Sequence, residues 1–425
     1  MSLKLSPKAS LLSIIAPYII AFLVVIVKPI EIVNDSEGYL NMVITRSAGY
    51  PLFLHGIKLC FGTFFNTATI ILQYGLGVCS IYFFIKTLKT CFNLHAIWLF
   101  LLNIILLAPY FYNHHLANVF LSEALSYPIY LIVVGLMLRS LTQKDVTFIL
   151  YAIPLLLLLI QTRSQFLFLI PIIIGIILWN HRLKYKGLLF LLIIFPFLCG
   201  FADKLYHKVA HDEFVSTPWT GIHLLTPAMY VSDASDYNIY NSQKAKALFK
   251  NSYKDLAKKH LNIHELNPNL HHENDLSIYV KEYSEIANFT ILPNGLALAD
   301  SLATHSKKLI EVDVLTKQMS IPLIINNFKA WLSLYIKNFI HAFGNAKYTL
   351  LLVIILGFSC IKAYQTNEIK YVTISCIVLL SLSNVALVAI GMHTLKRFTF
   401  YNDWVWFLIF ILLIHSGNKT SKYEL

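Results

Sequence analysis

The stretch TFILYAIPLLLLLIQTRSQFLFLIPIIIGIILWN, residues 147–180, decides the fold of this chain. It consists of two apolar runs that meet at a single charged residue, Arg163. A run of ~17–25 apolar residues is typical of a helix that crosses a membrane. Such runs recur along the chain and predict ten spans, near 11–27, 68–86, 95–112, 116–138, 147–162, 164–180, 187–203, 348–364, 371–391 and 402–416.

Composition supports a membrane protein and excludes disorder or an ordinary soluble enzyme. The 425 residues are 57% hydrophobic and 13% charged, whereas soluble domains have about 45–50% and ~25%. Of 34 Lys/Arg and 22 Asp/Glu, residues 204–320 hold 12 and 13. The whole basic excess therefore lies beside the apolar runs, which is typical of membrane orientation and not of nucleic-acid binding. We predict an all-α polytopic membrane protein with no nucleic-acid partner.

The basic residues also predict an orientation. With the N-terminus inside, cytoplasmic segments hold 13 Lys/Arg and the short outer loops hold 6. This bias predicts a multi-pass protein of the plasma (inner) membrane with both termini cytoplasmic. Segment 49–65 then does not cross, and we interpret it as a broken, interfacial or re-entrant helix because it contains three glycines and a proline.

Three regions follow from this orientation. Residues 1–203 form an N-terminal transmembrane module with a candidate catalytic first outer loop at 28–66. Residues 204–347 form a large extracytoplasmic insertion, whose last part, Ile321–Phe343, has polar and aromatic faces and predicts one helix in the membrane interface. Residues 348–425 form a C-terminal transmembrane module.

The first outer loop contains a cluster of polar residues. In IVNDSEGYLNMVITRSAGYPLF, residues 32–53, two carboxylates precede an arginine and a Gly-Tyr-Pro turn; the candidates are Asp35, Glu37, Tyr39, Arg46 and Tyr50. If Asn34 or Asp35 caps a short helix, Asp35 and Tyr39 lie one turn apart on one face. A solvated loop acid or a cap is the alternative for Asp35.

Other outer connections add acids and cations at the same membrane face. Glu123 is expected about two turns into the span at 116–138, where a charge costs about 2.5–3.5 kcal/mol. It is either functional or pairs with Arg163 or Arg46 to hold spans together, and Arg163 could equally be a snorkelling anchor. The remaining candidates are His114, His115, His393, Lys396 and Arg397.

Carboxylates and fixed cations at the outer interface suit glycosyl transfer from a polyprenyl phosphate. A phosphate leaving group needs Arg or Lys, and an incoming hydroxyl needs a carboxylate base. A base facing the sugar from the side opposite the phosphate predicts inversion at the anomeric carbon. The cations proposed to hold the phosphate are Arg46, Arg163, Lys396 and Arg397, and the substrate-binding candidates are Tyr39, Tyr50, His114, His115 and His393.

Four short motifs, DSEGY, RSAGYPLF, SEAL and HTLKRF, occur in an order that resembles the C-type (GT-C) membrane glycosyltransferase superfamily, including protein O-mannosyltransferases and lipid A aminoarabinose transferases. The resemblance implies a GT-C-like helical fold. It also implies that Asp35 acts at the catalytic centre, with Glu37 as a second candidate, and that Glu123 matches the acid at the start of the fourth span. The expected partners are a polyprenyl-phosphate sugar donor and a lipid, saccharide or protein acceptor.

Two other classes stay open. A secondary transporter also places acids and arginines among its helices, but usually near the midplane of two similar halves. A surface-polysaccharide polymerase or ligase would use arginines in its large outer loop, yet residues 204–347 contain none. Motifs for a metal or a nucleotide are absent from the sequence. A divalent cation bridging Asp35 and the phosphate stays an open alternative.

Overall fold

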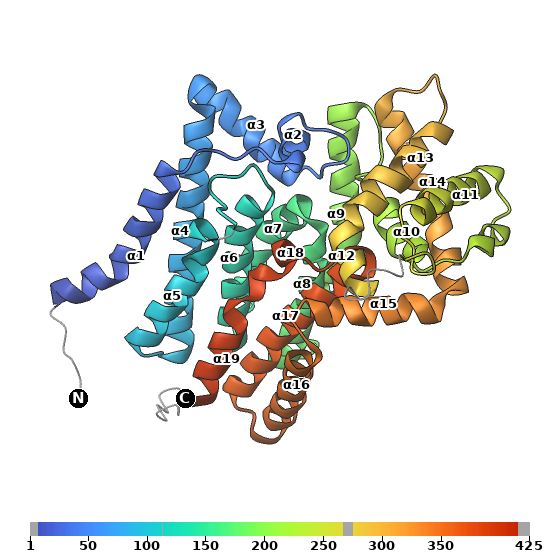
Figure 1. Ribbon diagram of the computed structural model, residues 1–425. Coiled ribbons are helices and arrows are strands. Elements are labelled where there is room, and N and C mark those ends of the chain that lie inside the picture. The colour runs from blue at the N-terminus through green and yellow to red at the C-terminus, as the bar shows by residue number, and fades with distance from the viewer. Residues whose placement is uncertain (1–6, 113, 267–274, 415–425) are drawn as a thin grey trace. The chain divides into compact units, whose positions relative to one another are not determined.

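The computed structural model describes residues 7–112, 114–266 and 275–414, and within these ranges the chain is helical (Figure 1). An isolated bridge between Glu31 and Val119 is the one β contact in the described part. The helices up to residue 211 are α1 (Pro7–Val27), α2 (Asn34–Leu40), α3 (Gly49–Phe61), η1 (Gly62–Phe64), α4 (Phe65–Phe92), α5 (Ala96–Phe111), α6 (Glu123–Gln143), α7 (Thr147–Thr162), η2 (Ser164–Phe168), α8 (Leu169–His181) and α9 (Lys186–His211). The remaining helices are α10 (Thr220–Tyr230), η3 (Ala234–Ile239), α11 (Gln243–Lys258), α12 (Asp275–Ile286), η4 (Ala287–Ile291), α13 (Leu292–Leu298), α14 (His305–Asn326), α15 (Phe328–His341), α16 (Ala346–Thr366), α17 (Ile369–Gly391), α18 (Lys396–Thr399), η5 (Phe400–Asn402) and α19 (Trp404–Ile414).

Seven helical segments in the described residues are long and apolar enough to cross a membrane: Gly49–Phe92, Glu123–Gln143, Ser164–His181, Lys186–His211, Ala346–Thr366, Ile369–Gly391 and Lys396–Ile414. Three shorter apolar helices are Ile15–Val27, Ala96–Phe111 and Thr147–Thr162. The architecture is that of an α-helical, multi-pass membrane protein. Ten spans stay a prediction, as does the orientation of the two termini, which lie outside the described residues.

The chain divides into two compact units. The first comprises Met1–Ala202, Ile354–Ser381 and Phe400–Leu425, and the second comprises Asp203–Val353 and Leu382–Thr399. Helices α9, α16 and α17 each contribute residues to both units.

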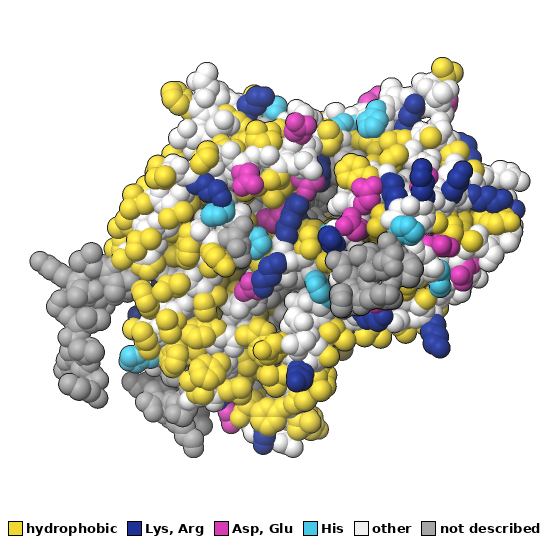
Figure 2. Space-filling model, viewed as in Figure 1, with side chains coloured by type: hydrophobic (Ala, Val, Ile, Leu, Met, Phe, Trp, Pro, Cys, Tyr) yellow, Lys and Arg dark blue, Asp and Glu magenta, His cyan; other side chains and the backbone are white. Residues whose placement is uncertain are grey.

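Helix α6 is the centre of the first unit. It packs against α4 on one side and α7 on the other, and its aromatic residues Tyr127 and Tyr130 are almost fully buried. Outer helices instead present apolar side chains outward, such as Ile20 of α1 at 63% exposure. Figure 2 shows hydrophobic side chains spread over the face that α1, α4 and α5 form. This distribution fits a unit whose solvent is lipid.

The second unit has a hydrophobic core, like that of a water-soluble domain, built around α10 and α14. Leu225 and Met229 of α10 pack with Phe249 of α11 and with α12 and α14. A Cβ at Gly221 would lie 2.8 Å from the backbone nitrogen of Lys317, so the glycine allows α10 to approach α14 closely. The helices therefore meet with little space for side chains between their backbones.

The expected span at 116–138 is wrong at its start, because α6 begins at Glu123. Residues 116–122 form a loop, and Asn118 fixes this loop to the end of α1. Its side-chain Nδ2 donates to the carbonyls of Val25 (2.8 Å) and Lys28 (2.7 Å) at the end of α1. Glu123 therefore lies in the first turn of α6 and not two turns into a span.

The single helix expected over Ile321–Phe343 is also wrong. It breaks at Asn327, between α14 and α15. The side-chain Nδ2 atoms of Asn326 and Asn327 donate to the Asp236 carboxylate at 2.8 and 2.6 Å. Asparagines favour such local interruptions because their side chains compete with the helical hydrogen bonds.

Segment 49–65 is broken, with α3 and α4 separated by η1. Gly62 has a positive φ of +50° at the break, which a glycine adopts without a steric penalty. That this segment does not cross the membrane stays a prediction.

Candidate functional site

Helix α2 carries the first two residues of the candidate site. The expected cap at Asn34 or Asp35 is wrong, because the N-cap is Val33, whose N–H donates to Ser36 Oγ at 3.0 Å. The Asp35 carboxylate instead accepts a hydrogen bond from Arg46 Nη2 at 2.8 Å. The two side chains are 35% and 25% exposed, so the pair is open to an approaching group.

Arg46 is held close to α2. A Cβ at Gly38 would lie 2.7 Å from Arg46 Nε, so the glycine provides the space that the guanidinium occupies. The guanidinium also lies over the ring of Tyr39, with 4.7 Å from Cζ to the ring centroid. Arg46 Nε is buried and has no hydrogen-bond partner in the described residues, whereas the side chain as a whole is 25% exposed.

Tyr39 connects this open pair to the interior. Its ring meets the ring of Tyr50 edge-on at 5.1 Å. Tyr50 is fully buried and donates its hydroxyl to Gln73 Oε1 at 2.7 Å. The hydroxyl of Tyr39 donates to Ser122 Oγ at 3.1 Å. The two tyrosines therefore fix α2 and α3 against α4 and the loop before α6.

Ser122 is the shared contact at the centre of the site. Its Oγ accepts from Tyr39 and from Arg163 Nη1 (3.2 Å), and it donates to Glu123 Oε2 at 3.3 Å. Arg163 also forms an ion pair of 2.7 Å with Glu123 Oε1. The side chains of this pair are only 11% and 2% exposed.

Helix ends place the buried pair favourably. Glu123 begins α6, where the helix dipole stabilises an anion, and Arg163 follows the last residue of α7, where it stabilises a cation. A Cβ at Gly49 would lie 2.8 Å from the backbone nitrogen of Thr162, so α3 can approach the end of α7 very closely. Gly49 thus brings the start of α3, which contains the Gly-Tyr-Pro sequence, against Thr162, the residue that precedes Arg163.

We call this set of side chains the arginine–carboxylate cluster: Asp35, Tyr39, Arg46, Ser122, Glu123 and Arg163. It joins α2, the following loop, the start of α6 and the end of α7 into one polar network inside the first unit. The network has a partly exposed end at Asp35 and Arg46 and a buried end at Glu123 and Arg163. The alternative in which Glu123 pairs with Arg163 is therefore what the structure contains.

Two candidate histidines of the first unit lie in the loop that follows α5. The His114 ring lies 4.5 Å from the ring of Phe400. His115 adopts a left-handed conformation, and its buried Nδ1 has no hydrogen-bond partner in the described residues. Burial, and to a lesser degree the nearby Lys28 ammonium, lower the pKa of His115 below its ordinary value. Glu37 is exposed, two residues from Asp35 and therefore on another side of α2.

Three candidates belong to the second unit. His393 is buried, donates from Nδ1 to the Val280 carbonyl at 2.7 Å and stacks on Tyr283 at 4.4 Å. Lys396 is exposed, and Arg397 lies 5.7 Å from the ring of Phe398.

Ser122 is the cluster member that the sequence predictions omit. Its signal in the sequence is weak, since a serine before a helix is usually read as a cap. Here it instead bridges a tyrosine, an arginine and a glutamate.

Among the residues that the structure describes, no group of three or more His, Cys, Asp or Glu side chains is arranged to hold a metal ion.

The comparisons with known proteins give no match: no family model, no curated protein and no solved structure resembles the chain significantly.

Proposed function

We propose that the protein is a membrane glycosyltransferase that moves a sugar from a polyprenyl-phosphate donor to a lipid, saccharide or protein acceptor at the extracytoplasmic face. The proposal includes ten spans, cytoplasmic termini, an inner-membrane location and an extracytoplasmic insertion at 204–347. The observation that carries it is the arginine–carboxylate cluster, in which two cations and two carboxylates form one network with a partly exposed end.

The exposed end of the cluster has the groups that such a transfer needs. Arg46 is a cation that Asp35 and the Tyr39 ring hold in place, and Asp35 is a carboxylate at its side. In the proposed reaction the donor phosphate replaces Asp35 on Arg46. Asp35 then takes the proton of the acceptor hydroxyl while that oxygen attacks the anomeric carbon. The bond from this carbon to the phosphate oxygen breaks, and the prenyl phosphate leaves with the negative charge, inverting the anomeric centre.

The buried end of the cluster has a positioning role in this proposal. Glu123 and Arg163 are too enclosed to exchange protons readily with a substrate. Both side chains hydrogen-bond to Ser122, and Ser122 accepts a hydrogen bond from the Tyr39 hydroxyl. The Tyr39 ring in turn packs against the Arg46 guanidinium. Substitution of Glu123 or Arg163 would therefore displace Arg46, although neither side chain contacts the sugar in the proposed reaction.

The test is a transfer assay with the full-length protein in liposomes and a panel of prenyl-phosphoryl hexoses and pentoses. Release of prenyl phosphate is measured for the parent, Asp35→Asn and Glu37→Gln. We expect Asp35→Asn to lose about 10²–10⁴-fold in rate, the usual contribution of a general base. Because the Asp35–Arg46 pair is partly exposed, its loss should change stability by only about 0–1 kcal/mol.

The matched variant separates the two acids. Glu37→Gln changes an exposed carboxylate on the same short helix and should retain the parent rate. An active Asp35→Asn protein would remove the base assignment, and a selective loss in Glu37→Gln would transfer it to Glu37. Donor-independent solute uptake into sealed liposomes, without prenyl phosphate release, would instead favour a transporter.

A further inference from the structure

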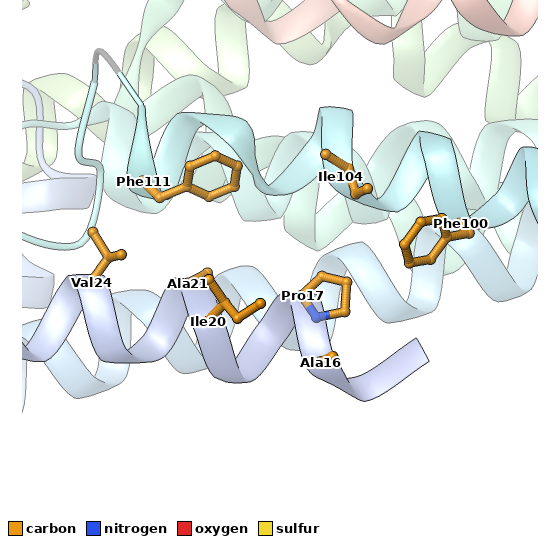
Figure 3. Close-up of a pocket in the computed structure, with 8 residues that line it drawn as sticks. All are labelled: Ala16, Pro17, Ile20, Ala21, Val24, Phe100, Ile104 and Phe111. Atoms are coloured by element: carbon orange, nitrogen blue, oxygen red, sulfur yellow. The ribbon is translucent and has the colours of Figure 1, made fainter. Parts of the chain in front are cut away.

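Two features outside the arginine–carboxylate cluster differ in the chemistry that they present. A groove between α1 and α5 in the first unit is lined by apolar side chains of both helices (Figure 3). Such a lining offers no polar contact that would select a ligand. The end of α9 belongs to the second unit and instead carries three ring side chains with buried polar atoms, which are Tyr206, His207 and His211.

The three rings contact one another. The ring centroids of Tyr206 and His207 lie 4.9 Å apart, those of His207 and His211 lie 5.4 Å apart, and those of Tyr206 and His211 lie 6.1 Å apart. His207 is fully buried, and Tyr206 is only 9% exposed. Because the two histidines are four residues apart, their rings lie one turn apart on the same face of α9. We call these three residues the α9 ring cluster.

Each ring of the cluster has one buried polar atom without a hydrogen-bond partner in the described residues. These atoms are the Tyr206 hydroxyl oxygen, His207 Nδ1 and His211 Nε2. A buried polar atom without a partner costs about 1–3 kcal/mol, and native proteins contain few of them. Three such atoms on rings that contact one another therefore indicate a common ligand.

The contacts of His207 determine which of its two nitrogens carries the proton. The Thr217 hydroxyl donates to the Asp203 carboxylate, at 3.0 Å from Oδ1 and 3.1 Å from Oδ2. The same hydroxyl oxygen lies 3.1 Å from His207 Nε2. Because the hydroxyl proton is directed at Asp203, this oxygen accepts the N–H of His207 Nε2. A neutral His207 therefore has an unprotonated lone pair on Nδ1, the atom without a partner.

This arrangement has the features of a histidine that binds a metal ion. Such a histidine usually donates its second ring N–H to a fixed acceptor, which sets its tautomer and ring orientation. Here Thr217 is that acceptor, and Asp203 Oδ1 lies 3.7 Å from the same Nε2. Two histidines at positions i and i+4 of a helix can bind one ion from the same face. Imidazole nitrogen is a suitable ligand for Zn²⁺, Cu²⁺ and Ni²⁺.

We propose that the α9 ring cluster binds one divalent transition-metal ion, such as Zn²⁺, through His207 Nδ1 and His211 Nε2. Water completes the coordination, and the Tyr206 hydroxyl hydrogen-bonds to one of these water molecules. The site has two protein ligands, so it is not one of the sites built from three or more His, Cys, Asp or Glu side chains. Asp203 and Thr217 act as positioning residues, because they hold the ring of His207.

The test measures Zn²⁺ binding to the full-length protein in nanodiscs, by competition with a chromophoric chelator. His207→Gln and His211→Gln should each weaken binding by more than about 10-fold, because even residues behind the ligands contribute about 10–100-fold. Asp203→Asn should weaken binding by about 10-fold for the same reason. His211 is partly exposed, so His211→Gln tests the site even where His207→Gln unfolds the protein. Affinities equal to that of the parent in both histidine variants would overturn the proposal.

The second unit contains a matched control pair. His260 and His264 have the same spacing, but His260 Nδ1 is 2.9 Å from the Glu265 carbonyl oxygen and His264 Nε2 is 3.5 Å from Asp233. His260→Gln should therefore bind Zn²⁺ as the parent does. A loss in His260→Gln as large as that in His211→Gln would show that the ion binds histidines without selection and would refute the assigned site.

The number of nitrogen ligands is tested with Cu²⁺. Electron paramagnetic resonance of the Cu²⁺-loaded parent should show coupling to two imidazole nitrogens, and His211→Gln should show coupling to one. Saturating Zn²⁺ should also raise the thermal unfolding midpoint of the parent, because it binds the folded state, and should not raise that of His211→Gln. No coupling and an unchanged midpoint in the parent would mean that water alone satisfies the three rings, which would refute the proposal. These measurements do not use glycosyl transfer, so the metal site and the proposed function can each fail without the other.

Discussion

Replacing Arg163 with methionine should destabilise the protein strongly. The ion pair that it removes joins atoms 2.7 Å apart, and the Glu123 side chain is only 2% exposed. Without Arg163 this carboxylate keeps Ser122 Oγ as a donor, at 3.3 Å, but loses the ion pair with the guanidinium. Removing one partner of a buried pair costs about 3–5 kcal/mol. Because Ser122 remains, we expect about 3 kcal/mol, the lower end of that range.

The assay is the free energy of unfolding of the full-length protein in detergent micelles, obtained from a denaturant titration. The double variant Glu123→Gln/Arg163→Met removes both charges, so it should be more stable than Arg163→Met by roughly 2 kcal/mol, within the usual coupling range. Such recovery separates an uncompensated charge from a simple loss of packing.

The chain contains a matched control. Lys259 and Glu285 also pair at 2.7 Å, but each side chain is 37% exposed. Lys259→Met should therefore cost about 0–1 kcal/mol. Similar small losses in Arg163→Met and Lys259→Met, or a double variant less stable than Arg163→Met, would refute the buried-charge reasoning.

Two further results are expected. Gly49→Ala should lower the free energy of unfolding by about 1–3 kcal/mol, because the added methyl group overpacks against Thr162. The control is Gly56→Ala, whose added Cβ meets no atom within 4 Å. Equal losses of unfolding free energy in the two variants would exclude close packing as the cause. Burial lowers the pKa of His393, although its hydrogen bond to Val280 raises it, so the unfolded chain binds more protons and stability should fall as the pH drops through about 6.5. Thermal midpoints from pH 8 to pH 5.5 should decrease less in His393→Gln than in the parent, and identical slopes would show that this histidine does not contribute.

Hydropathy was sufficient to predict the helical membrane architecture, because long apolar runs have few other stable structures. It could not position Glu123. The residues before it are nearly as apolar as those after it, so a window of residues extends the span to 116. The helix begins later because Asn118 bonds to α1 through side-chain contacts that join residues 93 and 90 positions apart. Such long-range hydrogen bonds leave no periodic pattern in a sequence.

The residue types in the sequence identified the members of the candidate site better than they identified the contacts among those members. Rare acids and arginines beside apolar runs indicated Asp35, Arg46, Glu123 and Arg163, but not which carboxylate pairs with which arginine. That choice depends on the close approach that Gly49 allows and on Ser122, a residue too common to attract notice. The roles of these residues in transfer stay predictions.

The hydrogen bonds between Asn118 and α1 can form only after a delay during biosynthesis. Val25 leaves the ribosome 93 residues before Asn118, a delay of roughly 5–20 s at ~5–20 residues per second. During this interval the end of the first helix lacks the amide that will satisfy its carbonyls. Early translocation intermediates should therefore keep that helix loosely anchored, and nascent chains arrested before this asparagine should be extracted from the bilayer more easily than chains arrested after it.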